Sequence, residues 1–352
     1  MDSSHSPEDI LQIVAKLVDQ GHDFVLAVVL EAEGSTPCRA GAKAIMDAEG
    51  VLEGTIGGGW VEFKTQQRAA ETIKIGRPIV LDFRLDSPAV GDDHPICGGA
   101  VRVLMDPMAV RHREAYATAA AIREAGQRGA LLTSVRGQKE WDVAVQCLVE
   151  QAITAAVGFP GTEVIRSALE REESGLFVSE VASEGQRLEV LVEPVIPEPV
   201  LLIVGGGHVG QAVAAQAVLV GFHIVVIDDR PEFTRPALFP HGATMRCGKI
   251  AAEVAGFPFG EDTYIVIVTR GHKHDADALA ACLHERVAYI GMIGSKRKVA
   301  MTRKDFVESG RATAEEFNRV YAPIGLAIGS VTVPEIAASI VAQLIAVRRN
   351  RT

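Results

Sequence analysis

The residues best placed to do chemistry begin with a glycine fingerprint in the second half of the chain. Gly205, Gly207 and Gly210 have the G-x-G-x-x-G spacing, directly after an apolar run at 200–204 that is typical of a strand buried in a parallel sheet. Such glycines let the backbone approach a pyrophosphate at the N-terminus of the next helix, and Asp228 follows where an acid binds a ribose hydroxyl. The pattern predicts a nucleotide-type site. The alternative is that the glycines only permit close packing of helix on strand.

A second loop, "TRGHKHD", follows another apolar run and contains His272, His274 and Asp275. Imidazole rings ligate metals when neutral and donate hydrogen bonds when charged, so this loop could bind a metal or an anion. No third clear metal ligand is present in the loop, which makes a metal the less favoured ligand. The competing interpretation is that Asp275 caps the next helix while both histidines are solvated.

A third loop, "IGMIGSKRK", brings Gly294, Ser295, Lys296 and Arg297 to the expected start of a helix. Backbone amides, a hydroxyl and cationic side chains at one place suit a phosphate group. The alternative is a solvated basic first turn. Because cations are unfavourable near a helix N-terminus, we expect a ligand to explain them.

The first half of the chain has three small-residue loops of its own. Ser35 and Thr36 lie in "EGSTPCRAGAK", three glycines at 57–59 lie in "GTIGGGWVE", and Cys97 precedes two glycines in "HPICGGA". Consecutive glycine amides can form an anion-binding nest, and a thiolate beside them is a soft metal ligand. Taken singly, each glycine pair is better explained by a hairpin or a bulge.

The elements that must position these loops fall into two groups. Apolar strands at 200–204, 223–227, 243–246, 264–268 and 287–291 alternate with helical segments, which predicts a C-terminal Rossmann-like, doubly wound parallel sheet. The strands before them predict an N-terminal α+β domain with a mixed or antiparallel sheet. Three prolines within residues 193–199 disfavour a helix and a central strand, so we expect domains at 1–195 and 196–352.

Composition restricts the class of protein. The 352 residues are 48% hydrophobic and 23% charged, as in ordinary globular proteins, and no apolar run is long enough to span a bilayer. A formal net charge of -10 argues against nucleic acid or an anionic membrane as the main partner. The five cysteines form no C-x-x-C pair, and the N-terminus has no secretory pattern. We therefore expect a cytoplasmic protein with reduced thiols.

Taken together and in this order, the loops resemble the XdhC/CoxI family of accessory proteins for molybdenum hydroxylases. The resemblance rests on "GSTP", "GAK", "GTIGGGWVE" and "CGG" in the first half of the chain. It continues with "GGGHVG", "TRGHKHD", "IGMIGSKRK" and "APIGLAIGSVTVPEIAASI" in the second half. These motifs extend over nearly the whole chain and are far more specific than a single glycine fingerprint.

The resemblance implies a chaperone rather than a catalyst. Such a protein binds the molybdenum cofactor, as molybdopterin or its dinucleotide form, and protects it while a cysteine desulfurase supplies the terminal sulfido ligand. It then helps to insert the cofactor into an apo molybdenum hydroxylase of the xanthine dehydrogenase type. A homo-oligomer, such as a dimer, is expected.

Two other functions stay open at the level of sequence. One is an NAD-dependent oxidoreductase that uses the fingerprint and Asp228, although no placed acid or base for hydride transfer is evident. The other is a nucleotide-sensing regulatory protein without chemistry. The expected cofactor-binding residues, with Cys97 also a candidate ligand of molybdenum, are Ser35, Thr36, Gly57, Gly58, Gly59, Cys97, Gly98, Gly99, Gly205, Gly207, His208, Gly210, Asp228, His272, His274, Asp275, Gly294, Ser295, Lys296 and Arg297.

Overall fold

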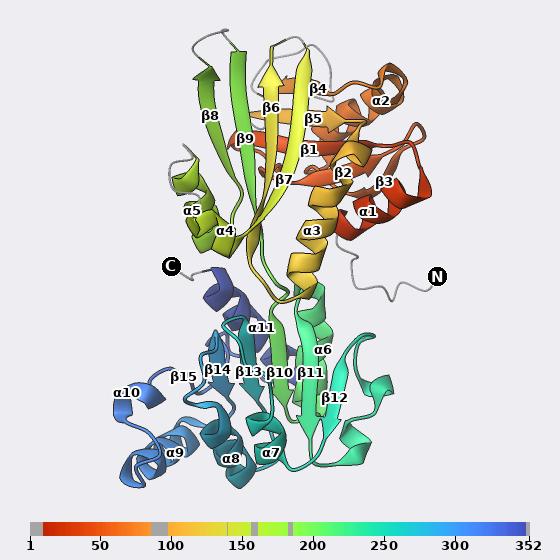
Figure 1. The fold of residues 1–352 in the computed structure, drawn as a ribbon. Coiled ribbons are helices and arrows are strands. Elements are labelled where there is room, and N and C mark those ends of the chain that lie inside the picture. Colours follow the sequence, from red (N-terminus) through yellow and green to blue (C-terminus); the bar gives the residue numbers. More distant parts are fainter. Residues whose placement is uncertain (1–9, 86–97, 139, 156–160, 182–185, 350–352) are drawn as a thin grey trace. The chain divides into compact units, whose positions relative to one another are not determined.

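The computed structural model describes residues 10–85, 98–138, 140–155, 161–181 and 186–349. The chain forms two compact units, which we call the N-terminal unit, Glu8–Pro197, and the C-terminal unit, from Glu198 onward. Figure 1 shows each as a set of strands with helices packed against them. Each unit is described by itself below.

The N-terminal unit contains two antiparallel sheets among its described residues, so the expected α+β architecture is confirmed with two sheets in place of one. Their strand orders are β3-β2-β1-β5-β4 and β7-β6-β9-β8. The strands of the first sheet are β1 (Val25–Gly34), β2 (Lys43–Met46), β3 (Val51–Gly54), β4 (Ile79–Arg84) and β5 (Gly99–Asp106). Those of the second are β6 (Gly129–Gly137), β7 (Trp141–Val149), β8 (Gly175–Val181) and β9 (Gln186–Val195).

Alternation along β1 explains how the N-terminal unit is layered. Val25, Ala27 and Val29 pack on the face covered by one helix, α2, whereas Leu26 and Val28 face the second sheet and two other helices, α1 and α3. A strand places successive side chains on opposite faces, so a wholly apolar strand is buried on both sides. The helices of this unit are α1 (Ile10–Gln20), α2 (Gly59–Ile75), η1 (Ala109–His112), α3 (Arg113–Glu124), α4 (Glu150–Ala155) and α5 (Thr162–Arg171).

The proline-rich segment differs from expectation at its start. Pro194 lies within β9, an interior strand of the second sheet, where it pairs with Ala130 of β6. The neighbouring strand β8 pairs with β9 only as far as Val192. Pro194 therefore has a strand on one side alone, and its missing N–H group breaks no ladder hydrogen bond there.

The C-terminal unit is a Rossmann-like sheet of six parallel strands in the order β12-β11-β10-β13-β14-β15, as predicted for this part of the chain. In Figure 1 the arrowheads of β10, β11 and β13 point to one edge of this sheet. The order reverses between β10 and β13, and ligands bind at such a switch point in doubly wound folds. The strands are β10 (Val200–Val204), β11 (His223–Asp228), β12 (Thr244–Cys247), β13 (Thr263–Ile267), β14 (Tyr289–Met292) and β15 (Val320–Tyr321).

Helices cover both faces of this sheet. Leu201 and Ile203 of β10 pack with α6 and α11, whereas Leu202 and Val204 pack with α7, α8 and α9. The two-residue strand β15 was not predicted, because it is too short for a period-2 pattern. The helices are α6 (His208–Ala217), η2 (Val218–Val220), η3 (Pro231–Phe233), η4 (Pro236–Leu238), α7 (Ile250–Ala255), α8 (His272–Cys282), α9 (Lys296–Glu308), α10 (Ala314–Phe317) and α11 (Val333–Arg349).

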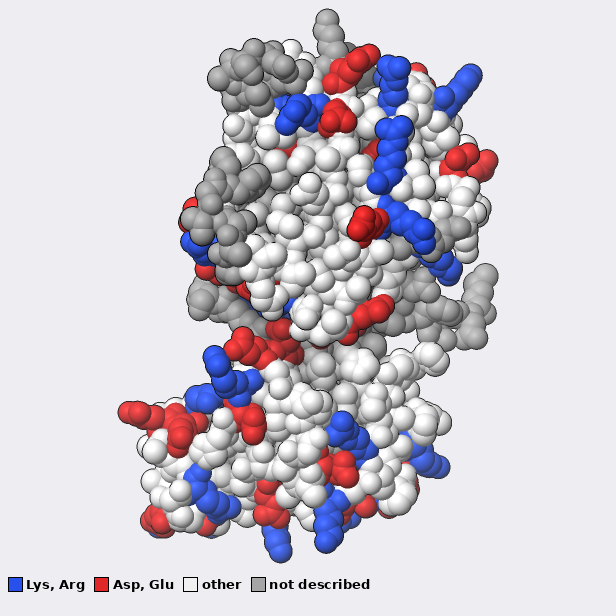
Figure 2. Space-filling view, in the orientation of Figure 1, with Lys and Arg blue, Asp and Glu red and all other residues white. Residues whose placement is uncertain are grey.

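Charged side chains of both signs are intermixed over the face of the C-terminal unit seen in Figure 2. No continuous basic surface covers the described residues on that face. This arrangement agrees with the formal net charge of -10 for the whole chain.

Candidate functional site

The glycine fingerprint forms a tight turn between β10 and α6, at the carboxyl edge of the parallel sheet. Gly205 has a φ of +116°, a conformation that favours glycine, and lies against the backbone of Val268 at the end of β13. A side chain at Gly206 would overlap the carbonyl oxygen of Phe233. Gly207, in contrast, has no atom within 4 Å of the place where a Cβ would be. Gly205 and Gly206 therefore serve close packing, whereas Gly207 leaves open space.

The N-terminus of α6 opens into that space. Gly207 is its N-cap residue, and no side chain caps the helix. His208, the first helical residue, is exposed, whereas Gly210 is buried against the carbonyl of Gly205. Uncapped N–H groups at the positive end of a helix dipole bind anions. This end of α6 can therefore accept a phosphate.

Asp228, at the end of β11, is fully engaged by protein groups. Its Oδ2 atom accepts hydrogen bonds from the N–H of Gly206 at 2.9 Å and from Nη2 of Arg230 at 2.9 Å. Its Oδ1 atom accepts from Nε and the backbone N–H of Arg230, at 2.9 and 3.0 Å. Asp228 is only 1% exposed. In this arrangement it braces the glycine turn and offers no free oxygen to a ribose.

The pKa of Asp228 reflects the same contacts. Burial alone would raise the pKa of the carboxyl group, but the hydrogen bonds from Arg230 and Gly206 outweigh that effect and lower it. The group is therefore ionised at neutral pH. A buried carboxylate held in this way fixes the turn through charge-assisted hydrogen bonds.

Two arginines outside the predicted site residues border the turn. The Arg230 guanidinium lies over the ring of Phe233, 3.8 Å from its centroid. Nη2 of Arg270, which follows β13, bonds Oδ2 of Asp229 at 2.8 Å and so links the loops after β11 and β13. The "DDR" triplet at 228–230 could have predicted the Asp228–Arg230 pair, because an arginine two residues beyond an acid at the end of a strand can bond back to that acid.

In the second predicted loop, Asp275 is buried and does not cap α8. Its Oδ1 atom accepts from the N–H and the hydroxyl of Thr269, at 3.1 and 2.5 Å, and its Oδ2 atom is paired with Nζ of Lys298. His272 is exposed and His274 is half-buried. Within the described ranges, no three His, Cys, Asp or Glu side chains are grouped as a metal site. Asp275 thus ties the second loop to the third.

The third loop starts α9 with a side-chain cap. The Ser295 hydroxyl accepts a hydrogen bond from the N–H of Lys298 at 3.2 Å. Lys296 and Arg297 are exposed, and Gly294 lies beside the Lys298 side chain. The basic residue built into the sheet edge is therefore Lys298. The two cations predicted to bind a phosphate, Lys296 and Arg297, face solvent.

In the N-terminal unit the structure brings the small-residue loops together. The N–H of Ser35 bonds the carbonyl of Gly98 at 3.1 Å, and Gly99 pairs with Gly34 at the ends of β5 and β1. Gly57 packs against Cys38, with no room for a side chain between them. The loops at 34–38, 55–59 and 98–99 therefore form one cluster.

The predicted anion nest at 57–59 already holds an anion from the chain itself. Oε2 of Glu62 accepts from the hydroxyl of Thr55 at 2.6 Å, from the N–H of Ile56 at 3.0 Å and from the N–H of Gly58 at 3.3 Å. Gly59 is open, with no atom within 4 Å of an added Cβ. An external anion at the N–H groups of Ile56 and Gly58 would have to displace the Glu62 carboxylate.

Of the cysteines, Cys38 and Cys282 are buried, Cys147 is half-buried and Cys247 is exposed. Cys38 is 4% exposed, and its burial raises the pKa of the thiol, although a hydrogen bond between the Cys38 and Thr36 side chains offsets part of the shift. Burial also raises the pKa of Cys147 to about 11 and that of Cys282 to about 12. Cys97 lies outside the described residues. Its predicted role as a molybdenum ligand therefore stays a prediction.

Among the described helices, none is both long enough and apolar enough to cross a membrane.

Comparisons with known proteins cover both units. Residues 201–344 match the family model of the XdhC Rossmann domain, and residues 17–84 match that of the XdhC and CoxI family. The chain is 26% identical over 346 residues to the uncharacterized protein YqeB of Escherichia coli, covering 97% of this chain and 47% of that protein. The chain thus spans about half the length of that relative.

Two other relatives match along nearly their whole length. A probable xanthine dehydrogenase subunit of Bacillus subtilis is 25% identical over 337 residues, which covers 95% of this chain and 96% of that protein. A crystal structure described as a xanthine dehydrogenase from Bacillus halodurans superimposes with a TM-score of 0.77 at 23% identity, covering 97% of this chain and 96% of that one. At that identity the superposition establishes the shared fold. The two family matches, on the two units and in the order that the motifs predicted, show that this chain belongs to the XdhC and CoxI family.

Proposed function

We propose that the chain is an accessory protein that binds the molybdenum cofactor of a xanthine dehydrogenase-type hydroxylase. It protects the cofactor while a cysteine desulfurase supplies the sulfido ligand, and it helps to insert the cofactor into the apo-enzyme. Family membership and the Bacillus subtilis relative, named as part of a probable xanthine dehydrogenase, support this proposal. When bound, the cofactor brings the redox-active molybdenum that the hydroxylase needs.

The observation that carries the proposal is the open N-terminus of α6 at the switch point of the parallel sheet. Gly207 leaves space at the uncapped helix end. The cofactor has a phosphate, or a pyrophosphate in its dinucleotide form, and such groups bind at helix N-termini in this fold. Arg230 and Arg270 lie at the same edge, where each is paired with a carboxylate, of Asp228 and of Asp229, so these four side chains add no net charge.

The residues present fit the phosphate part of the cofactor. N–H groups at the N-terminus of α6 would hold the phosphate, and Lys296 and Arg297 are exposed cations that could close over it. The described residues offer no cluster of metal ligands, and the prediction that Cys97 ligates molybdenum is separate from this phosphate site. A dithiolene-bound molybdenum needs few protein ligands, and a thiolate is a suitable soft one.

The contacts of Asp228 weigh against an NAD-dependent oxidoreductase. That function would use Asp228 to accept hydrogen bonds from a ribose, but both of its oxygens bond to Gly206 and Arg230. NAD binding would require this pair to break. A nucleotide-sensing regulatory protein would need only a bound nucleotide. The identity of the bound ligand therefore distinguishes it from the proposed cofactor-binding protein.

The first experiment identifies what the purified full-length protein carries. Oxidation of any bound pterin to its fluorescent form, together with metal analysis, is expected to give pterin and molybdenum in similar amounts. Tightly held nicotinamide without molybdenum would contradict the proposal. Activation of an apo-hydroxylase by the loaded protein, with and without a cysteine desulfurase, then tests insertion and sulfuration.

A matched pair of variants tests the site itself. Gly207→Asp and Gly207→Asn place side chains of one shape at the N-cap of α6, where both residues stabilise a helix and space is open. The aspartate repels a phosphate, so we expect it to lower cofactor content at least tenfold, with a smaller loss for the asparagine. Equal cofactor content in wild type and Gly207→Asp, at unchanged thermal stability, would place the cofactor elsewhere.

A further inference from the structure

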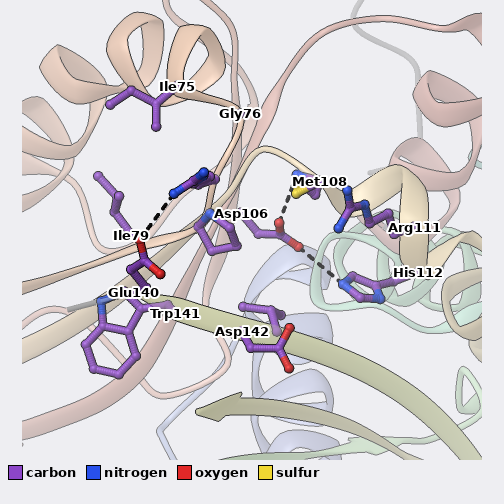
Figure 3. A pocket seen from close by; sticks show the side chains of 13 residues that line it. Ile75, Gly76, Ile79, Asp106, Met108, Arg111, His112, Glu140, Trp141 and Asp142 are labelled. Carbon is purple, nitrogen blue, oxygen red and sulfur yellow. Dashed lines mark hydrogen bonds and ion pairs between the residues drawn. The ribbon is translucent and has the colours of Figure 1, made fainter. Parts of the chain in front are cut away.

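The N-terminal unit contains a cavity that none of the motifs predicted. It has a volume of about 540 Å³ and lies at the Asp106 end of β5, whereas the small-residue loops meet at the Gly99 end. Three segments line it: the turn between α2 and β4, the segment from Asp106 to His112, and the start of β7. Figure 3 shows side chains of all three around one space. Pockets that bind small molecules have volumes of this order.

A buried acid in this cavity has one oxygen without a donor. Asp106 is only 2% exposed, and its Oδ1 atom accepts a hydrogen bond from the N–H of Met108 at 2.8 Å. Its Oδ2 atom lies 3.8 Å from Nε2 of His112, which is too long for a hydrogen bond (Figure 3). No group in the described part of the chain donates to Oδ2. Because buried polar atoms are almost always hydrogen-bonded, this oxygen indicates a donor supplied by a ligand.

An ammonium group fits between Asp106 and His112. It has three donors, and one nitrogen can lie about 2.9 Å from both Oδ2 and Nε2, since these atoms are 3.8 Å apart. Burial lowers the pKa of His112, so its ring is neutral near pH 7 and accepts at Nε2 when its proton is on Nδ1. Both acceptors can therefore bond the same cation.

The charge of Asp106 also favours a cationic ligand. Burial raises the pKa of its carboxyl, and the Met108 N–H and the charges of His112 and Arg111 offset this only in part. A cation against Oδ2 stabilises the ionised form. Any proton that the carboxyl holds before binding is released to water, and the carboxylate then accepts from Met108 at Oδ1 and from the ammonium at Oδ2.

A cation for an anionic group lies at the mouth of the same cavity. Nη1 of Arg77 bonds Oε1 of Glu140 at 3.2 Å, whereas Arg111 is exposed and forms no ion pair with the described side chains (Figure 3). Arg111 is close enough to Asp106 for its charge to act on that carboxyl. A guanidinium binds a carboxylate through charge-assisted hydrogen bonds. The cavity thus offers an acid and a base to one small molecule.

The wall between these groups is apolar and partly aromatic. Ile79 and Trp141 are half-buried, and Val143 is buried. The guanidinium of Arg102 lies 5.4 Å from the centroid of the Trp141 ring and helps to hold the indole in place. Aromatic rings pack favourably on such a surface.

We propose that this cavity binds a free α-amino acid with an aromatic side chain. The ammonium group of the ligand donates to Oδ2 of Asp106 and to the ring of His112. Its carboxylate pairs with Arg111, and its aromatic ring lies against Trp141. The proposal depends on this cavity alone and is independent of the cofactor site proposed for the C-terminal unit.

Calorimetric titration of the full-length protein compares L-phenylalanine with three analogues that each lack one group. The ammonium is missing from 3-phenylpropionate, the carboxylate from phenethylamine, and the aromatic ring from glycine. Each analogue is expected to bind at least tenfold more weakly than L-phenylalanine, because one contact is lost and its partner in the cavity stays unpaired. Equal binding of any one analogue, or failure of L-phenylalanine to bind the folded protein at millimolar concentration, would overturn the proposal.

Two variants locate the two charged contacts. Asp106→Asn keeps an oxygen for the Met108 N–H but loses the carboxylate charge, so the preference for L-phenylalanine over 3-phenylpropionate should disappear while 3-phenylpropionate binds as before. Arg111→Gln should abolish the preference for L-phenylalanine over phenethylamine and leave phenethylamine binding unchanged. Asp23→Asn is the control, because Asp23 is exposed and does not line the cavity, and it should keep both preferences.

A preference that survives in the corresponding folded variant would refute that contact and, with it, the site. Arg111 is exposed, so its substitution remains a test if Asp106→Asn fails to fold. None of these results depends on molybdenum. A protein that carries molybdenum without binding L-phenylalanine supports the proposed function and contradicts this inference, and the reverse result does the opposite.

Discussion

Replacing Asp228 with asparagine should destabilise the C-terminal unit by breaking the brace under its glycine turn. Asparagine keeps the size of the side chain but turns one acceptor oxygen into a donor. Gly206 and Arg230 donate four hydrogen bonds to Asp228, two to each oxygen. After the substitution, the two donors at the replaced oxygen face another donor. Each bond to a charged group contributes about 1.5–3 kcal/mol. The Arg230 side chain is 22% exposed and can turn to water, so we expect a total loss of about 2–4 kcal/mol.

Urea unfolding at pH 7 measures this loss, and hydrogen exchange assigns it to the C-terminal unit. Asp229→Asn is the matched control, because it makes the same change one residue later. The Asp229 side chain is 26% exposed, and the 2.8 Å ion pair it makes with Arg270 lies at the surface. We expect that control to cost less than about 1 kcal/mol. Equal losses in the two variants would refute the assigned role of Asp228.

The pH dependence gives a second check on the same residue. A carboxyl group whose pKa is lowered by folding stabilises the native state above its unfolded pKa, near about 3.9, and this stability is lost as the pH falls through the folded pKa. The stability difference between wild type and Asp228→Asn should be constant from pH 7 to about 5 and shrink below about pH 4. A difference that does not change with pH would show that the carboxylate charge is not its source.

Three further variants test other contacts of the two units. Lys298→Met leaves the buried Asp275 carboxylate without its cation and should lower the free energy of unfolding in urea by about 2–4 kcal/mol. The loss should be smaller when Asp275→Asn is also present, and additive losses in this double-mutant cycle would contradict the pairing. Gly206→Ala should lower the melting temperature by several degrees, because its Cβ overlaps a backbone carbonyl, whereas Gly207→Ala should leave it nearly unchanged; similar shifts would disprove the difference in space. Glu62→Gln weakens the bonds to the 55–58 loop and should speed hydrogen exchange there without affecting the C-terminal unit; unchanged exchange would exclude Glu62 as the anion of the nest.

The parallel sheet could be predicted from the sequence because its central strands are continuous apolar runs. Val200–Val204 and Thr263–Ile267 are buried almost throughout, and such runs need no knowledge of distant partners to be recognised. The glycine turn could also be predicted, because it depends only on adjacent residues. The contacts of the two acids could not be predicted in this way. Asp228 was expected to bind a ribose, and Asp275 either to contact a ligand or to cap a helix; in the structure both carboxylates hold loops together.

The reason is that these contacts join residues far apart in the chain. The partner of Asp275 is Lys298, which belongs to the next loop along the sheet edge, and spacing does not reveal which of three adjacent basic residues turns inward. The cavity beside Asp106 was missed for the same reason. Its lining comes from three separate segments, and neither Asp106 nor His112 belongs to a motif with a recognisable period.

The strand order of the C-terminal unit also bears on how the unit folds. The central strand β10 pairs with β11, which follows it closely, and with β13, which is made much later in synthesis. Until β13 emerges, the open edge of β10 has unpaired backbone groups beside the apolar side chains of Leu202 and Val204. Long-range pairing of this kind slows folding and leaves such edges available for aggregation. We therefore expect the N-terminal unit, which is synthesised first, to fold before β13 pairs with the open edge of β10.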